Sequence, residues 1–83
     1  MKTLPERLAW ARGAAGLSAR GLDRKAGLHG GHTQLIESGR RVDPSSETVK
    51  RLARALGISI DWLIDGNGMA PSEDALRSMR DSA

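Results

Sequence analysis

The sequence predicts an all-α fold, a compact bundle of five short helices followed by a short tail or an extra helix. Apolar residues recur at helical spacing in several segments, and short connections that contain glycine or proline separate these segments. No segment alternates at the two-residue period of a half-buried strand. A chain of 83 residues is enough for one small domain, which we place at residues 1–65. Residues 66–83 then form a flexible acidic tail or a short sixth helix, available for dimerisation or for contact with a protein partner.

The first helix is expected between about Pro5 and Ala15, because proline is tolerated in a first turn, where its missing N–H would be unsatisfied anyway. Its apolar residues fall on one helical face: Leu4, Leu8, Ala11 and Ala15. Arg12 lies beside this apolar stripe.

The second and third helices are expected at Ser18–Ala26 and at about Gly30–Ser38, ended by Gly27 and Gly39 respectively. Ser18 is a good N-cap because its hydroxyl can accept a hydrogen bond from a free backbone N–H of the first turn. Gly27 provides the left-handed residue at which helices commonly end. Two helices joined by so few residues must cross steeply, which leaves the second of them prominent at the surface, in a geometry that suits a DNA groove.

The fourth helix should begin near Ser45 or Ser46 and end at Leu56, and a fifth should follow Ser59. The fourth carries apolar residues at positions i, i+3, i+4 and i+7: Val49, Leu52, Ala53 and Leu56. A further short helix with a thin apolar stripe is expected at residues 72–80. An isolated helix of this length is marginal in water, so it docks on the body, pairs with a second subunit or frays.

The composition excludes several classes of protein. Without cysteine there is neither a disulfide framework nor a thiolate metal site, which fits a reducing cytoplasm. No apolar run approaches the roughly 18 residues that a membrane span needs, and the N-terminus lacks a signal-peptide pattern. We therefore expect a cytoplasmic protein, bacterial or phage in origin, that uses no metal or other cofactor and does not bind a membrane.

Charge is spread unevenly along the chain. Residues 1–64 contain 11 Lys/Arg and 6 Asp/Glu, a net charge of +5, whereas residues 65–83 contain 2 and 4, a net charge of −2. A basic body favours a polyanionic partner such as nucleic acid. An enzyme is not expected, because cysteine is absent, only two histidines are present and no glycine-rich phosphate loop follows a strand.

The second and third helices resemble those of the phage-repressor/Cro (XRE-type) helix-turn-helix DNA-binding family. The matching residues are Ser18, Leu22, Ala26, Gly27, Leu28 and Ile36, followed by Glu37-Ser38-Gly39-Arg40-Arg41. The resemblance extends from Leu4 to Gly66 and so covers most of the chain, with the motif itself at residues 18–38. It implies a bundle of the phage-repressor type.

The resemblance also implies roles for individual residues. Arg12 is expected to pair, largely buried, with Glu37 and so to hold the first helix against the third, whose core anchor is Ile36. In the family, base edges are contacted from positions at the start and along the outer face of the third helix: Gly30, Gly31, His32, Gln34 and Leu35. The loop after this helix lies along the DNA backbone, which makes Arg40 and Arg41 candidate phosphate partners.

The residues of the third helix differ in what they offer to DNA. Gln34 is the best candidate for a base contact, since a carboxamide can bond adenine at N7 and N6 together. His32 can donate to a guanine or bond a phosphate, and Leu35 offers only apolar contact, for instance to a thymine methyl. Gly30 and Gly31 lack side chains, but their bare N–H groups can approach a phosphate at the positive end of the helix. For each of these side chains, the alternative is a solvated surface residue.

The chain departs from the family pattern at two places. Ala19 stands where a phosphate-bonding Gln is usual, so each half-site is expected to bind more weakly, unless Arg20 and Arg24 supply the missing phosphate contacts. Asp23 stands where Ala is usual, and Thr33 where Ile or Val is usual. Together, these changes predict that the Asp23 carboxylate accepts hydrogen bonds from the Thr33 hydroxyl, or from free N–H groups at the start of the third helix. The alternative is an exposed Asp23.

The leading functional hypothesis is sequence-specific binding of double-stranded DNA by a homodimer that regulates transcription, as a repressor at a palindromic operator. A protein-interaction module that has lost DNA reading is the main alternative, because Ala19, Gly30, Gly31 and Leu35 lack polar side chains. A further alternative is an antitoxin that represses its own operon and contacts a toxin through residues 66–83.

Overall fold

The computed structural model describes residues 1–41 and 43–81, and the regular structure of these residues is entirely helical. Six helices follow in order: α1 Leu4–Ala14, α2 Ala19–Lys25, α3 His32–Glu37, α4 Ser46–Leu56, α5 Ile60–Asp65 and α6 Glu73–Asp81. The all-α prediction is confirmed, and among the described residues α6 stands where a tail or an extra helix was expected after the five helices of the bundle. None of these six helices is long and apolar enough to cross a bilayer.

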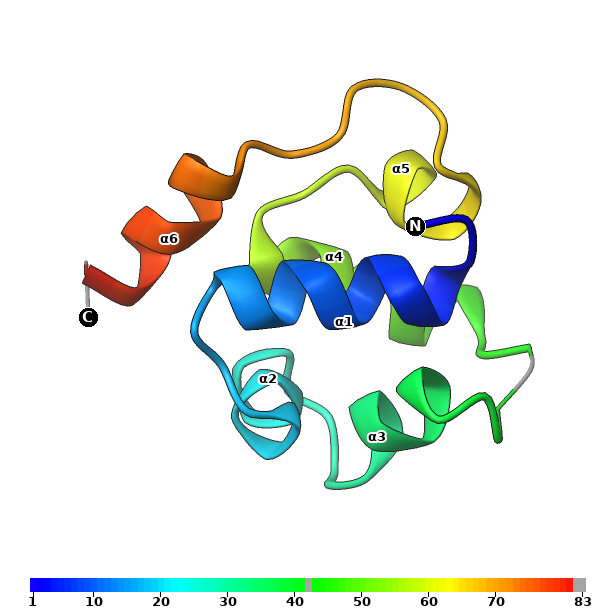
Figure 1. Ribbon diagram of the computed structural model, residues 1–83. Coiled ribbons are helices and arrows are strands. Elements are labelled where there is room, and N and C mark those ends of the chain that lie inside the picture. The colour runs from blue at the N-terminus through cyan, green and yellow to red at the C-terminus, as the bar shows by residue number, and fades with distance from the viewer. Residues whose placement is uncertain (42, 82–83) are drawn as a thin grey trace.

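Helix α1 is the centre of the arrangement. It packs against α3, α5 and α6, while α2 contacts α3 and α4, and α4 contacts α5. Figure 1 shows α2 and α3 together on one side of α1, with α5 on the other. The core lies between these helices and takes a fully buried side chain from most of them: Leu8, Leu22, Ile36, Leu52, Leu56 and Leu63.

Serine and threonine residues precede five of the six described helices, since the Ser72 hydroxyl also accepts from the Ala75 N–H at the start of α6. Thr3, Ser18, Ser45 and Ser59 each have an extended backbone, and each side chain accepts a hydrogen bond from the N–H three residues later. The predicted starts of α2, α4 and α5 therefore shift by at most one residue. Helix α1 begins at Leu4, one residue earlier than predicted, because the cap is Thr3.

Arg7 joins α1 to the end of α5 and was not singled out from the sequence. Its side chain is buried, with 4% exposure, and its Nε donates to the carbonyl oxygen of Leu63 at 2.9 Å. A second guanidinium nitrogen, Nη2, donates to the carbonyl oxygen of Ile64. A cation suits these carbonyls, because the end of a helix carries partial negative charge and lacks intrahelical donors.

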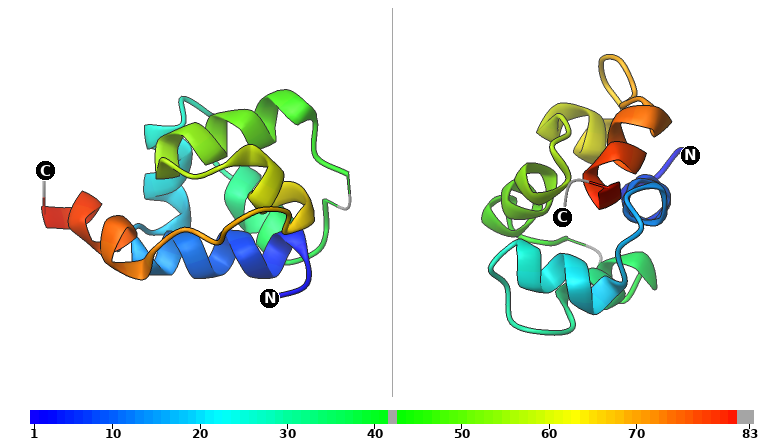
Figure 2. Two further views of the ribbon diagram at one scale, coloured as in Figure 1. Left: turned by 90° about the horizontal axis from the view of Figure 1, so that it is seen from above. Right: turned by 90° about the vertical axis from the view of Figure 1, so that its left-hand side faces the viewer.

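Helix α6 docks on the body, which is the first of the three alternatives given for this segment. Leu76 is only 2% exposed and belongs to the same core cluster as the other helices, and Met79 packs partly against it. The connection between α5 and α6 runs over the surface, and α6 lies at the side of the molecule away from α3 (Figures 1 and 2). Residues 82 and 83, the last two of the predicted tail, lie outside the described residues.

Candidate nucleic-acid interface

The turn between α2 and α3 differs from the expected one. Gly27 has a positive φ of 73° and ends the first helix of the motif as predicted. Helix α3 then begins at His32, two residues later than predicted, because Gly31 stands before it with a φ of 101°. Gly30 and Gly31 are thus part of the connection and not of the helix. Gly31 has no side chain with which to cap α3, so the free N–H groups at the start of this helix need another hydrogen-bond partner.

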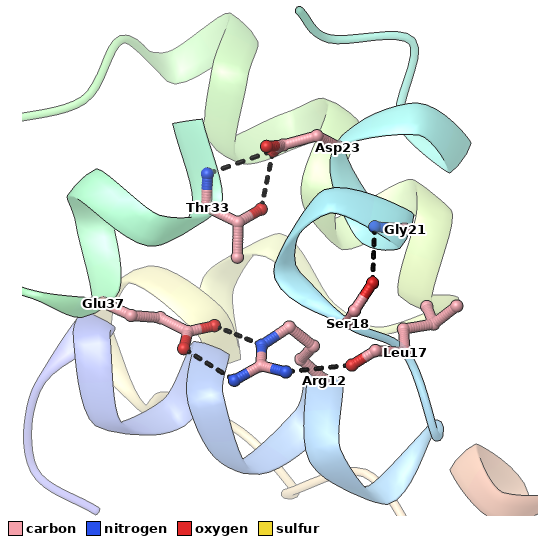
Figure 3. Close-up of polar contacts among 7 residues, drawn as sticks. All are labelled: Arg12, Leu17, Ser18, Gly21, Asp23, Thr33 and Glu37. Atoms are coloured by element: carbon pink, nitrogen blue, oxygen red, sulfur yellow. Dashed lines mark hydrogen bonds and ion pairs between the residues drawn. The ribbon is translucent and has the colours of Figure 1, made fainter. Parts of the chain in front are cut away.

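Asp23, in α2, supplies that partner. One carboxylate oxygen, Oδ2, accepts from the Gly31 N–H at 3.0 Å, and Oδ1 accepts from the Thr33 N–H at 3.0 Å and from the Thr33 hydroxyl at 2.7 Å. Asp23 is 2% exposed and Thr33 is fully buried. The structure therefore contains the predicted contact in both of its forms, and the exposed Asp23 that was the alternative is wrong (Figure 3).

This buried carboxylate changes what the start of α3 can offer to DNA. The Gly31 N–H donates to Asp23 and is not available to a phosphate or a base. The negative charge of the carboxylate also occupies the end of the helix at which an anion would otherwise be favoured. The prediction that bare N–H groups of Gly30 and Gly31 receive a phosphate here is therefore wrong for Gly31, and Gly30 precedes the helix.

The other end of α3 is held by Arg12 of α1. Arg12 Nε donates to Glu37 Oε2 at 2.6 Å, and Nη2 donates to Oε1 at 2.9 Å, which is a bidentate pair. Its third nitrogen, Nη1, donates to the carbonyl oxygen of Leu17 at 2.9 Å, ahead of α2 (Figure 3). The hydrogen bonds that Arg12 donates to the Glu37 carboxylate raise the pKa of Arg12, so this side chain stays charged. Arg12 thus joins α1 to the end of α3 and to the connection that leads into α2, as part of a largely buried pair.

The outer face of α3 is open. Gln34 and Ser38 are exposed, Leu35 and His32 are half-buried, and Ile36 points into the core with no exposed surface. A shallow hollow of about 490 Å³ runs along this face and is lined by Gly31, Gln34, Leu35, Ser38 and Arg40. The described residues therefore leave the face that the sequence assigned to DNA free for a ligand.

Cationic side chains flank this face at both ends. Arg40 is exposed and lines the hollow just described. Arg20 and Arg24 are exposed on α2 and border a second hollow of about 340 Å³ together with Leu28, His29 and Gly30, at the turn that leads into α3. Three of the four arginines predicted to contact phosphate are thus solvent-accessible and near α3.

The fourth, Arg41, has a partner that the sequence did not indicate. Its Nη1 lies 3.1 Å from Nδ1 of His32, the first residue of α3. Its backbone N–H donates to the carbonyl oxygen of Leu35 at 3.0 Å, which folds the loop back against the helix. Arg41 and His32 were assigned separate roles from the sequence, and the structure brings them together.

The sequence did contain a signal for the overlooked Arg7. Leu4, Arg7, Leu8 and Ala11 follow the i, i+3, i+4, i+7 pattern, which places Arg7 on the buried face of α1. A charged residue at such a position needs partners, and the open carbonyls at the end of α5 provide them. No comparable local signal connects His32 with Arg41.

Comparison with known protein families gives one finding. Residues 4–65, about three quarters of the chain, match the family described as "Helix-turn-helix domain". The match spans α1 to α5, including the Asp23 cap and the Arg12–Glu37 pair, and ends before α6. Neither the curated proteins nor the solved structures yield a match.

Proposed function

The chain belongs to the helix-turn-helix domain family, and we propose that it is a sequence-specific double-stranded DNA-binding protein that regulates transcription. In this proposal it is a non-enzymatic cytoplasmic repressor of the phage-repressor/Cro type that acts as a homodimer. Each α3 occupies one of two successive major grooves, about 34 Å apart, on a palindromic operator.

The observation that carries the proposal is the open face of α3, held rigidly from behind. Asp23 and Arg12 fix the two ends of the helix, and Ile36 anchors its middle. Gln34 lies on the exposed side of the helix, and its carboxamide makes no hydrogen bond to any other described residue. A carboxamide can read adenine through paired hydrogen bonds. A helix positioned in this way meets the geometric demand of base reading.

The flanking arginines supply the positioning contacts. Arg20, Arg24 and Arg40 are exposed beside the open face, so each is placed to meet a phosphate. Phosphate contacts of this kind make affinity fall steeply as salt rises, because counterions are released from DNA. Ala19 contributes no such contact, and we expect a modest affinity for a single half-site.

The direct test is selection from random duplex pools at low and at moderate salt. We expect the protein to enrich a palindrome, with two equivalent half-sites centred about one helical turn apart. Gln34→Ala should then lose its preference at one base position per half-site by about 1–3 kcal/mol, with unchanged thermal stability. Arg24→Ala is the matched control, because loss of a phosphate contact weakens binding to all sequences equally.

A protein-interaction module is the second candidate, and the Asp23 cap favours it. The carboxylate removes the anion-binding end of α3, and the half-buried Leu35 adds apolar surface to the hollow on its outer face. Weak, uniform binding to all duplexes would support this candidate. Co-purification of a toxin encoded in the same operon would instead support an antitoxin that represses its own operon.

A further inference from the structure

The contact between Arg41 and His32 lies on the proposed DNA-binding face. His32 is the first residue of α3, and Arg41 returns to it from the loop that follows the helix. The backbone hydrogen bond from the Arg41 N–H to the carbonyl oxygen of Leu35 holds the loop in this position, and so keeps the arginine side chain close to the imidazole.

The chemistry of this contact determines the state of the imidazole. A guanidinium has only donors, so Nδ1 of His32 must accept the hydrogen bond through its lone pair. A neutral imidazole carries its single N–H on the other nitrogen, Nε2. Nε2 bonds no other group in the described part of the chain, so it is the nitrogen left to bind a ligand.

We infer that Arg41 is a positioning residue that fixes His32 as an N–H donor, and that this donor reads a guanine in the major groove. The inference rests on the proposed DNA binding and deepens it by naming the base. The N-terminal residues of a recognition helix contact base edges, which favours a base over a phosphate as the partner of His32.

Guanine is the base that best fits an N–H donor with a positive charge beside it. Its major-groove edge presents two acceptors, N7 and O6, whereas adenine pairs one acceptor with an amino donor and thymine pairs one acceptor with a methyl group. Cytosine presents an amino donor and would oppose an N–H. Arg41 donates one of its five N–H groups to His32 and brings a positive charge close to the edge of the base that His32 contacts, which again favours guanine.

The first measurement concerns the free protein and does not depend on DNA. Long-range ¹H–¹⁵N NMR of His32 in the full-length chain, at a pH where the ring is neutral, should show the proton on Nε2 and an unprotonated Nδ1. Arg41→Ala should shift the Nδ1 resonance, while Arg40→Ala, which removes the same charge one residue earlier, should leave it in place. A proton on Nδ1, or equal effects of the two variants, would overturn the inference.

The second measurement uses the selected operator. His32→Ala and Arg41→Ala should lose about 5- to 10-fold of the preference for guanine at the same single position of each half-site. Arg40→Ala should lower affinity for all sequences alike. Replacing that guanine by 7-deazaguanine, which lacks the N7 acceptor, should weaken wild-type binding by a similar factor and leave binding of His32→Ala unchanged. Inosine keeps the major-groove edge of guanine and should bind as guanine does.

The outcomes separate the two proposals. If the wild-type chain enriches no sequence, the proposed function fails and the inference fails with it. If it enriches a palindrome that Gln34→Ala alters, but His32→Ala alters no guanine position, the proposed function stands and the inference is overturned. If His32→Ala instead lowers the affinity for all sequences equally, this side chain contacts a phosphate, and that result would also overturn the inference.

Discussion

Helices α3 and α4 are held in place by different physical means. Helix α4 has 11 residues, six of them buried, and begins with its own cap, Ser45. Helix α3 has six residues, two of them buried, and no capping side chain of its own. Side chains from other helices hold both of its ends, Asp23 from α2 and Arg12 from α1. The apolar face of α4 stabilises the fold, whereas directional polar bonds orient α3.

The difference teaches why a helix so short can hold a defined orientation with one face open. Apolar contacts are non-directional and grow with buried area, so a helix that depends on them must cover its face. Hydrogen bonds to charged groups fix distance and angle with few atoms. Helix α3 is thereby positioned from behind, and its outer surface remains open for the proposed base contacts, since binding geometries of this kind tolerate only about 0.5 Å of misplacement.

The largest effect is expected from Asp23→Ala. Loss of the carboxylate strands the N–H groups of Gly31 and Thr33 and the Thr33 hydroxyl, at a cost of about 3 kcal/mol in the free energy of unfolding. We expect hydrogen exchange to rise first at residues 31–36, while α4 keeps its protection. Chemical denaturation and native-state hydrogen exchange measure both quantities. Equal loss of protection in α3 and α4 would contradict the comparison, and unchanged stability would contradict the role of Asp23 as a cap.

Two control variants sharpen this test. Thr33→Val removes only the hydroxyl and keeps the N–H bond, so it should cost about 1 kcal/mol. Leu52→Ala opens a cavity beneath α4 at a cost of about 3 kcal/mol, similar to that of Asp23→Ala. Its loss of protection should extend over the whole core, because apolar packing is shared among α1, α4 and α5.

A smaller effect is expected from the Arg12–Glu37 pair. Arg12→Ala or Glu37→Ala alone should cost about 2 kcal/mol, less than for a fully buried pair, because the side chains are 24% and 16% exposed. A double-mutant cycle should give a coupling energy of about 1–2 kcal/mol. Because the pKa of Arg12 is raised in the fold, its contribution to stability is complete below the ordinary pKa of an arginine and is lost only as pH rises through the higher folded value. Stability measured at pH 7 and pH 9 should therefore give the same coupling energy. A coupling energy near zero would contradict the role of the Arg12–Glu37 pair in holding α3.

The smallest effect concerns an exposed cap at α1. The Glu6 carboxylate accepts from the Thr3 hydroxyl and from the Lys2 N–H, and these bonds lower its pKa below 4.5. A lowered pKa stabilises the fold above the ordinary value, and this stabilisation is lost as pH falls through the folded value. Glu6→Gln should lower Tm at pH 7 by less than about 3 °C.

Thermal melts from pH 7 to pH 3 check this prediction. The wild-type chain and Glu6→Gln should converge as the carboxylate is protonated. If Glu6→Gln lowered Tm as much as Asp23→Ala does, an exposed cap between neighbouring residues would stabilise the fold as much as a buried cap from another helix. That result would contradict the distinction between local caps and caps from other helices.

Local patterns predicted much of the fold. The apolar spacing in α4 and the serine caps of α2, α4 and α5 are properties of neighbouring residues, so the chain order alone reveals them. The Asp23–Thr33 contact could be predicted because two unusual residues with matching chemistry stand ten positions apart. The Arg12–Glu37 pair followed from the family resemblance and not from the residues alone.

What the sequence did not reveal depends on contacts between distant segments. The start of α3 was placed too early because Gly31 adopts a left-handed conformation and its N–H bonds to Asp23 instead of joining the helix. The approach of Arg41 to His32 depends on how the loop after α3 folds back. Docking of α6 depends on apolar side chains of other helices that come together only once those helices have packed.

The position of Leu76 has a consequence for where this molecule can be divided. The recognisable family unit ends at residue 65, yet the core ends in α6, eleven positions further on. A protein trimmed at residue 65 would keep the complete helix-turn-helix motif and leave bare apolar surface on α1. The smallest part that contains the helix-turn-helix domain and the smallest part that contains the whole core therefore have different borders.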